Sequence, residues 1–469
     1  MSYEDANAGL SFNTPVYMQY QKPDVSIEEG PDQFTIIRSQ AGNTNYHPNE
    51  VIRIHLSSTD KFIRPNKCFV TFKVQLTKGG SALTNAPTGL TTSWAGVPGG
   101  SFFRIRTSCL GREIEDVQHY GAYLGAVYAK LPQEAVNVLS ATEATNNQSD
   151  MLSNWFAAGR YYAHAPKTAV FESSRLLPIP FMRSLDVEFI VGQLGQLIAT
   201  QANVQAYQPD SFTISDFAFH ACWVPVSQAY LSEFYTGIME HNKEAIVPIK
   251  KTTVIPVNIA NPAANMTQIY ALGQLDSLAS ATFLIRDGSV FQPTTSSAQY
   301  QSATAYNTTG LTTILDGDET RNSNSTRVAE WWLTADGKRF PSDMNVGLPA
   351  SMDAGGTLLR VSDICYNLAS VDMNYAGINV PVSATPIAQN SVPFFEDTYR
   401  DGILHWSWEP TAISFGQGLK LSDSLLQLNT NVCNGGYNAN TRCDGFFVYD
   451  THLVIRKEGV DVVSAGFRT

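Results

Sequence analysis

The fold of this chain is decided by residues 101–132, which read SFFRIRTSCLGREIEDVQHYGAYLGAVYAKLP. At the start of this stretch, Phe103 and Ile105 alternate with arginines, which is the two-residue period of a half-buried strand. Leu110-Gly111 then offers a turn, and the alternation resumes at Glu113-Ile114-Glu115. The pattern therefore predicts an antiparallel hairpin.

After this hairpin the apolar residues change to a helical period. They are Val117, Tyr120, Leu124, Val127, Tyr128 and Leu131. Pro132 ends the run because its ring cannot continue a helix. A hairpin that passes into one short helix, in a chain otherwise rich in strand patterns, indicates a β-sandwich decorated with short helices.

The composition agrees with an all-β protein of more than one domain. At 469 residues the chain is too long for one compact core, so we expect two domains of roughly 200 residues each. Only 16% of the residues are charged and 11% are aromatic, a mixture that suits many short strands joined by loops. The net charge of −11, with no Lys/Arg run, disfavours direct sequence-specific binding of nucleic acid.

The cysteines and the N-terminal sequence indicate a reducing compartment. MSYEDANAGLSF lacks the basic and apolar regions of a signal peptide, and no window approaches the ~18 apolar residues of a membrane span. We expect Cys68, Cys109, Cys222 and Cys365 to be buried as small hydrophobic residues. Cys433 and Cys443 bracket a loop and could pair, although a cytosolic origin argues against a disulfide.

The patterns divide the chain into four segments. Residues 1–33 are polar with spaced apolar side chains and predict an extended N-terminal arm. Residues 34–226 predict a first sandwich, and residues 227–245 have the helical spacing of a connector. Residues 246–469 predict a second sandwich with a long surface insertion around 291–345. Each half closes with a long alternating strand, so we expect two similar all-β domains in tandem.

Alternation along the strands also predicts the two cores. Leu185, Val187, Phe189, Phe219 and Trp223 are expected in the first core. Phe447, Tyr449, Leu453 and Ile455 are expected in the second.

No residue pattern predicts chemistry. The eight histidines are scattered without HxH or HExxH spacing, and there is no GxSxG or phosphate-binding loop. The acidic loop at residues 316–319 lacks the spacing of a calcium site. We therefore predict no catalytic residue, no cofactor and no metal site. The alternative is a carbohydrate-binding or glycan-cleaving β-sandwich protein, with Trp331, Trp332, Trp406 or Trp408 as the stacking platform.

Three stretches resemble a known family. They read VIRIHLSSTDKFIRPNKCFVTFKVQL (51–76), SFFRIRTSCLGREIEDVQHYGAYLGAVY (101–128) and FFVYDTHLVIRKEGVDVV (446–463). They resemble the double jelly-roll major capsid proteins of DNA viruses, and most closely those of polinton-like viruses and virophages. The resemblance covers most of residues 34–260 and the last strand, and little between about 290 and 400.

The resemblance implies a fold and a function. The fold would be two tandem antiparallel eight-stranded jelly rolls with a few short helices and long loop insertions. The protein would be a structural component of the virion, made in the host cytoplasm or nucleus, and not an enzyme. It would form a homotrimer that acts as a pseudo-hexagonal capsomer of an icosahedral capsid. Its partners would be neighbouring capsomers, minor capsid proteins and penton proteins. The resemblance does not decide whether a membrane lies beneath the capsid.

Two groups of side chains are then candidates for the assembly interface. The first group, Phe12, Val16, Tyr17 and Tyr20, recurs along the N-terminal arm, and an extended segment buries such side chains only against a preformed surface. The second group, Trp331 and Trp332, follows the polar insertion and is costly to leave bare. We expect these two tryptophans to anchor the return of the insertion.

Overall fold

The computed structural model of the chain describes most of the predicted strands and several of their connections. The described residues are 31–83, 90–92, 98–129, 161–194, 198–200, 210–258, 266–273, 275–287, 327–340, 346–347, 403–409, 415–416, 418–421, 425–433 and 441–464. Every strand ladder among them is antiparallel. No helix within these ranges is long and apolar enough to cross a membrane.

The N-terminal half contains two sheets that enclose a core. The first has the order β1 (Gln33–Ile37), β13 (Ser211–Pro225), β5 (Phe69–Lys78) and β10 (Tyr162–His164). The second has the order β3 (Val51–Leu56), β11 (Leu185–Val191), β8 (Phe102–Cys109) and β9 (Arg112–Gln118). Short strands extend the first sheet: β2 (Asn45–Tyr46) and β4 (Lys61–Ile63) pair with β13, and β6 (Ser81–Ala82) pairs with β5. β7 (Leu90–Thr92) and β12 (Ile198–Thr200) form a separate pair.

The C-terminal half repeats this arrangement. One sheet has the order β14 (Ala245–Asn258), β23 (Thr441–Arg456), β16 (Leu275–Asp287) and β20 (Ile403–Ser407). The other has the order β15 (Met266–Ala271), β22 (Leu425–Cys433), β17 (Arg327–Ala335) and β18 (Lys338–Phe340). The additional strands are β19 (Val346–Gly347) on β17, β21 (Leu419–Leu421) on β16 and β24 (Gly459–Ser464) on β23.

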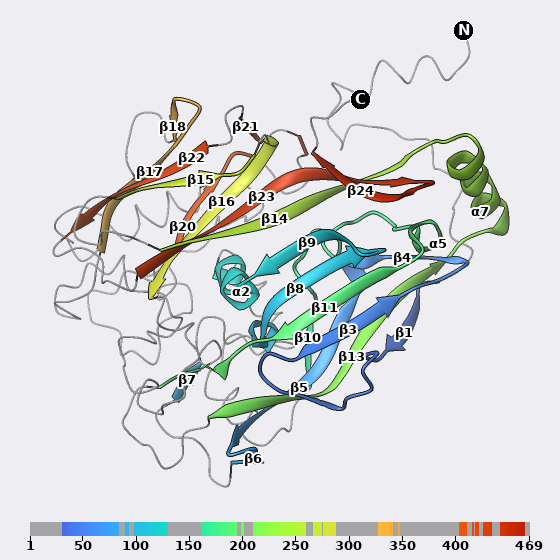
Figure 1. Cartoon of the computed structure of the whole chain (residues 1–469), viewed down its shortest axis with the longest axis horizontal. Helices are drawn as coiled ribbons and strands as arrows, with labels where there is room; N and C mark the ends of the chain where they lie inside the picture. Colours follow the sequence, from blue (N-terminus) through green and yellow to red (C-terminus); the bar gives the residue numbers. More distant parts are fainter. Residues whose placement is uncertain are drawn as a thin grey trace.

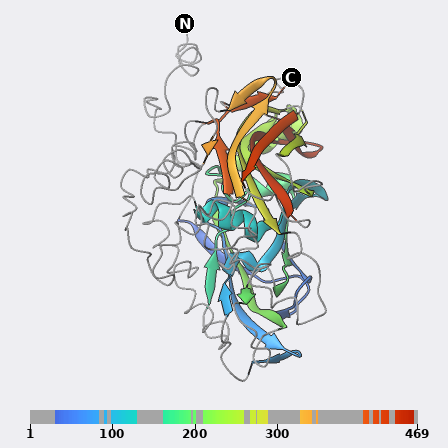
Figure 2. The same cartoon turned by 90° about the vertical axis from the view of Figure 1, so that its left-hand side faces the viewer.

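Both halves therefore have the same topology. If the eight main strands of each half are counted in chain order, one sheet holds strands 1, 8, 3 and 6 and the other holds strands 2, 7, 4 and 5. This is the strand order of a jelly roll, in which the first and last strands are neighbours. The prediction of two tandem eight-stranded antiparallel jelly rolls is confirmed, and Figures 1 and 2 show the second roll stacked on the first.

The deciding hairpin forms between β8 and β9, with two local differences from its expected pattern. Leu110 (φ 50°) and Gly111 (φ 78°) make the two-residue turn that suits the twist of paired strands. Phe102 rather than Phe103 enters the core, because the β8–β11 register shifts next to Val191. Val117 belongs to β9 rather than to the helix, and the chain changes direction only at His119, where φ is 52°.

The helices lie between strands. They are α2 (Tyr120–Ala129), α5 (Ile179–Met182) and α7 (Gln228–Tyr235), with a π-helical turn η5 (Thr236–Glu240) after α7 and short 3₁₀ turns η2 (Pro65–Lys67) and η3 (Pro98–Ser101). α7 starts where the Ser227 hydroxyl oxygen accepts the Tyr230 backbone N–H at 3.2 Å, a standard N-cap. α7 and η5 thus occupy the segment expected to connect the two sandwiches (Figure 1).

The predicted core residues of the first roll are confirmed. Leu185, Val187, Phe189, Phe219 and Trp223 are all buried in one cluster. In the second roll, Phe447 is buried and Tyr449 packs against the same cluster. The prediction was wrong for Leu453 and Ile455, which are buried in the cluster that includes the first roll. The last part of β23 pairs with β24 instead of β16, so it extends past its own core and packs onto the first roll.

The C-terminal part of the insertion expected around residues 291–345 is not a surface loop in the structure. Residues 327–340 form the β17–β18 hairpin, which is integral to the second roll. Asp336 (φ 47°) and Gly337 (φ 73°) form its turn, and Asp-Gly is a strong hairpin signal that the polar composition obscured. Residues 288–326 lie outside the described part of the chain.

Candidate functional site at the junction of the two rolls

The junction is the contact of β9 and α2 in the first roll with β14, β23 and β24 in the second. A β-bulge in β9 determines which side chains the first roll presents to this contact. Thr107 pairs with Glu115 and Ser108 pairs with Glu113, so Ile114 is an extra residue in the ladder. As a result Ile114 and Glu115, although consecutive, are both buried. The bulge therefore turns a carboxylate of β9 toward the second roll.

Glu115 hydrogen-bonds backbone groups of both rolls. Its Oε1 accepts the N–H of Thr252 on β14 at 2.6 Å, and its Oε2 accepts the N–H of Ala169 in the first roll at 2.5 Å. Burial raises the pKa of Glu115 to about 8, although the two N–H donors and the more distant Lys251 act in the opposite direction. One fully buried carboxyl thus ties β14 to the first roll.

An aromatic contact lies next to this carboxyl. The ring of Tyr123 on α2 stacks on Phe446 of β23, with 5.4 Å between ring centroids. The Thr252 hydroxyl donates to the Tyr123 hydroxyl at 3.4 Å. Burial raises the pKa of Tyr123, so its hydroxyl stays protonated. Apolar packing and buried hydrogen bonds therefore hold the same two strands.

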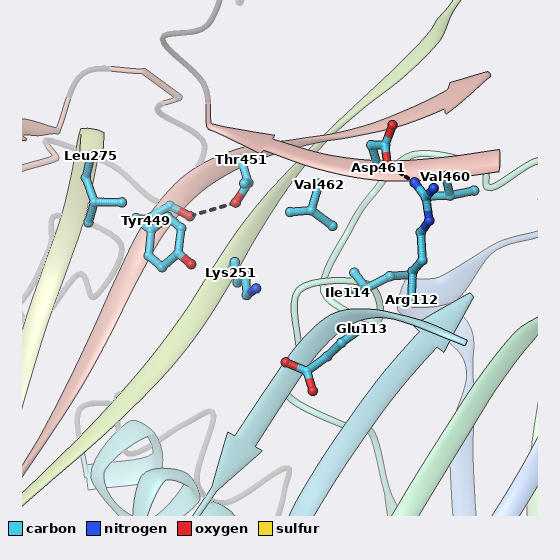
Figure 3. A pocket seen from close by; sticks show the side chains of 10 residues that line it. All are labelled: Arg112, Glu113, Ile114, Lys251, Leu275, Tyr449, Thr451, Val460, Asp461 and Val462. Carbon is cyan, nitrogen blue, oxygen red and sulfur yellow. Dashed lines mark hydrogen bonds and ion pairs between the residues drawn. The ribbon is translucent and has the colours of Figure 1, made fainter. Parts of the chain in front are cut away.

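A cavity and an ionic rim complete the junction on the side of β24 (Figure 3). The cavity has a volume of about 430 Å³ and is lined by residues 112–114 of β9 and residues 460–462 of β24, together with residues of β14, β16 and β23. At its rim, Arg112 forms an ion pair with Asp461 across the junction. Arg456 contacts Asp461 at 3.3 Å and Glu244 at 2.6 Å. These rim pairs are partly exposed, so each contributes little stability.

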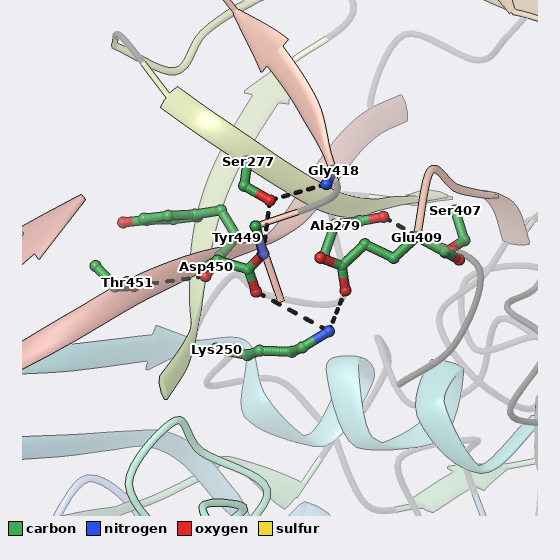
Figure 4. Close-up of polar contacts among 10 residues, drawn as sticks. Lys250, Ser277, Ala279, Ser407, Glu409, Gly418, Tyr449, Asp450 and Thr451 are labelled. Carbon is green, nitrogen blue, oxygen red and sulfur yellow. Dashed lines mark hydrogen bonds and ion pairs between the residues drawn. The ribbon is translucent and has the colours of Figure 1, made fainter. Parts of the chain in front are cut away.

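A buried polar network supports the second-roll side of the junction (Figure 4). Lys250 on β14 lies opposite Asp450 on β23 and forms an ion pair with Glu409, which follows β20. Asp450 Oδ2 accepts the Ser277 hydroxyl and the Gly416 N–H, each at 2.6 Å. Burial and the nearby Asp450 raise the pKa of Glu409 to about 7, and Lys250 opposes this shift. The network adds side-chain contacts between β14, β16 and β23 and the residue that follows β20.

Within the described ranges this arrangement connects the two rolls mechanically. No group of three or more His, Cys, Asp or Glu side chains there is placed to hold a metal ion. Histidines of the described part are dispersed among separate partners: for example, His55 contacts Asp186 at 2.6 Å, His164 contacts Tyr120 at 2.7 Å, and His220 contacts Thr71 at 2.9 Å. Cys68, Cys109 and Cys222 are buried, as expected for small hydrophobic residues.

Of the six predicted interface residues, the described part of the chain includes Trp331 and Trp332. Phe12, Val16, Tyr17 and Tyr20 lie outside the described residues. Trp331 lies within β17, where its backbone pairs with Thr430 and Val346. Trp332, the next residue, is half-buried, and the Arg339 guanidinium lies 4.8 Å from its ring centroid. Both tryptophans are thus built into a strand.

The tryptophans named for a glycan-stacking platform are also engaged in packing. Trp406 is buried in the second core, and Trp408 packs against that core. The Phe340 ring meets Trp408 edge-on at 5.6 Å between ring centroids. A sugar would need one of these faces open, and Arg339 lies over that of Trp332.

Sequence reasoning missed the residues that form the junction. Glu115 sits in an alternating polar pattern that predicts a solvent-facing side chain, and only the bulge at Ile114 reverses this. Lys250 and Asp450 were not singled out, because their pairing depends on the β14–β23 register. No local signal in the sequence marks any of these three positions.

The comparisons with known proteins agree with this architecture. No protein-family model matches the sequence, and no match was found among the curated proteins. Among solved structures, the chain is similar to the PBCV-1 protein VP54 as fitted into a reconstruction of the virophage Sputnik, with a TM-score of 0.53 and 10% identity over 95% of this chain and 100% of that one. It is similar to a chain of the PBCV-1 virus capsid, with a TM-score of 0.51 and 9% identity over 95% of this chain and 100% of that one.

A third similar structure is that of the Sputnik virophage itself. Its TM-score is 0.51, with 12% identity over 98% of this chain and 92% of that one. At such low identity these likenesses establish the fold alone. With the repeated strand order, they show that the described part of this chain has the double jelly-roll fold.

Proposed function

We propose that this chain is a viral major capsid protein, of which three copies form a pseudo-hexagonal capsomer of an icosahedral shell. The observation that carries the proposal is the presence of two complete jelly rolls in one chain, joined through a buried junction. Three such chains present six similar rolls around a threefold axis, which allows a nearly hexagonal outline. Full-length similarity in fold to the PBCV-1 capsid and the Sputnik virophage supports this role.

The junction fits a load-bearing subunit. A shell protein must keep the two rolls in a fixed relation while neighbours press on them. Glu115 and the Tyr123–Phe446 pair join the rolls through buried contacts that water does not weaken. In this role the chain is a structural protein and not an enzyme, and it resides in the virion shell after synthesis in the host cytoplasm or nucleus.

The remaining parts of the chain have proposed roles in the same assembly. We assign residues 34–226 to the first jelly roll, 227–245 to the connector and 246–469 to the second roll. Residues 1–33 would be an arm that reaches a neighbouring capsomer through Phe12, Val16, Tyr17 and Tyr20. Trp331 and Trp332 would support a contact between subunits. Neighbouring capsomers, minor capsid proteins and penton proteins are the partners.

Mass photometry of the purified full-length chain tests the proposal. We expect a species with three times the 51.3 kDa mass of the chain, stable on dilution. Negative-stain images of that species should have a hexagonal outline. A monomer at all concentrations would contradict the proposal, and a monomer that binds a glycan array would favour the carbohydrate-binding alternative.

Deletion of residues 2–30 tests the arm. Ordering an arm costs ~1–2 kcal/mol per residue in backbone entropy, so we expect it to become fixed only in the shell. The deletion should leave trimers intact while it lowers the yield of assembled particles. Normal particle yield from the truncated chain would show that the arm serves another purpose.

A further inference from the structure

The sheet that contains the first and last strands of each roll has an outer face. This face is covered in the second roll and exposed in the first. In the second roll, the outer face of the β14–β23 pair is closed by the first roll. Thr252 on β14 and Phe446 on β23 lie on this face, and both are buried beneath Glu115 and Tyr123. Their counterparts in the first roll are the outward side chains of β1 and β13, which occupy the same places in the strand order.

In the first roll this face is open. Phe34 and Ile36 on β1 are 55% and 59% exposed. Ile36 pairs with His220 on β13, and His220 pairs with Phe69 on β5, so their side chains share one face. The Phe69 ring stacks on His220 at 4.4 Å and lies 6.2 Å from Phe34 between centroids. We call Phe34, Ile36, Phe69 and His220 the β1 patch.

The element that closes the second roll also has a counterpart. β9 follows β8 through the positive-φ turn Leu110-Gly111, and β18 follows β17 through the positive-φ turn Asp336-Gly337. A cation comes directly after each turn, Arg112 in β9 and Lys338 in β18. Arg112 reaches across the junction to Asp461, whereas Lys338 is exposed.

Each half of the chain therefore has one hairpin, β8–β9 or β17–β18, and one outer sheet face, that of β1–β13 or of β14–β23. Within one chain, the first roll's hairpin covers the second roll's face. The second roll's hairpin and the first roll's face are left over, and a single chain cannot bring them together while the junction holds the rolls stacked. The partner that supplies both missing surfaces is another copy of this chain.

We propose that the β1 patch is the docking surface for a second copy of this chain, whose β17–β18 hairpin covers it as β9 covers β14 within the chain. This inference rests on the proposed capsomer and names its subunit contact. The contact is head-to-tail, because each copy offers one hairpin and one patch, and such a contact closes into a ring when the rotation permits. Half-buried Trp332, on the same face of the hairpin as Arg339, supplies apolar surface to match Phe34 and Ile36, whereas Phe340 lies on the opposite face and packs against the second core.

The first test removes the apolar side chains of the patch. The double variant Phe34→Ser/Ile36→Ser should raise the concentration at the midpoint of trimer association by at least about 10-fold, since two central apolar contacts are lost. The matched control is Ile269→Ser/Leu425→Ser, which changes two residues that are 54% and 42% exposed on another sheet face of the second roll. We expect the control to associate like the wild type.

The second test identifies the occupant of the patch. Chains carrying Ile36→Cys are mixed with chains carrying Arg339→Cys and oxidised. A disulfide between the two different chains, absent when Arg339→Cys is replaced by Ile269→Cys, supports docking of the hairpin. Trimers that persist without this cross-link would overturn it.

The outcomes separate this inference from the proposed function. If the wild type is trimeric and the Phe34/Ile36 variant is equally trimeric, the docking inference is wrong and the capsomer stands. A monomeric wild type overturns both. If the variant lowers the melting temperature of the dissociated chain instead, the patch packs against its own chain, and the inference fails.

Discussion

The two rolls share a topology, but they differ in how they bury the same outer face. In the second roll, Phe446 and Thr252 are buried under Glu115 and Tyr123 from the same chain. In the first roll, the corresponding face exposes Phe34 and Ile36. Strand order alone therefore does not decide which surfaces are buried. The covered face of the second roll stabilises the folded chain itself, whereas the exposed face of the first roll is available for contact with another subunit.

The largest effect is expected from the covered face. Phe446→Ala should destabilise the isolated chain by ~3–5 kcal/mol, because it removes a fully buried ring and leaves a cavity beside Tyr123. Phe34→Ala should cost under ~1 kcal/mol in the same chain, since its ring is already more than half exposed. Chemical denaturation at a concentration below association measures both, and equal losses would remove the distinction between the faces.

A smaller effect is expected from the buried carboxyl that holds the covered face. Glu115→Ala should cost ~2–4 kcal/mol, because it leaves the N–H groups of Thr252 and Ala169 buried without their acceptor. Glu113, two positions earlier on β9, is exposed, so Glu113→Ala is the matched control and should change stability by less than ~0.5 kcal/mol. Similar values for both variants would show that the Glu115 bridge does not hold the junction.

The smallest expected effect is a dependence on pH. Because folding raises the pKa of Glu115 from its ordinary value of 4.5 to about 8, its contribution to stability is fully present below the lower pKa and is lost as the pH rises through the higher one. We expect the wild type to lose ~1–3 kcal/mol between about pH 5 and pH 9. Glu409, whose pKa is raised to about 7, contributes in the same direction.

Glu115→Gln separates these two contributions. The variant cannot ionise at this position, so its stability should fall less steeply with pH and retain only the part due to Glu409. Urea denaturation of wild type and variant across this pH range measures the slopes. Identical slopes would mean that Glu115 does not titrate in this window.

The sequence predicted the large features because alternation and turn chemistry are local. The Leu110-Gly111 turn, the alternating strand β11 and the helical spacing after Ser227 each appear within about ten residues. Asp336-Gly337 carried an equally local signal, but the polar residues before it favoured a loop. The tandem repetition was visible as two long closing strands and corresponds to β13 and β23.

The junction could not be predicted in the same way. Glu115 is buried only because a bulge shifts one residue of β9. Leu453 packs on the first roll only because β23 continues past β16 and the second core. Both effects depend on ladder register between distant segments, which alternation within one strand does not encode. The open β1 patch has no local sequence signal for the same reason, since Phe34, His220 and Phe69 meet through two separate ladders.

Hydrogen exchange of β1 and β14 tests the central claim most directly. The measurement compares backbone amides of residues 33–37 with those of residues 245–258, at concentrations above and below the association midpoint. We predict that β14 exchanges equally slowly at both concentrations, whereas β1, an edge strand paired only with β13, exchanges more slowly in the associated state than in the dissociated one. Equal exchange of β1 in both states, in a protein that does associate, would contradict the account.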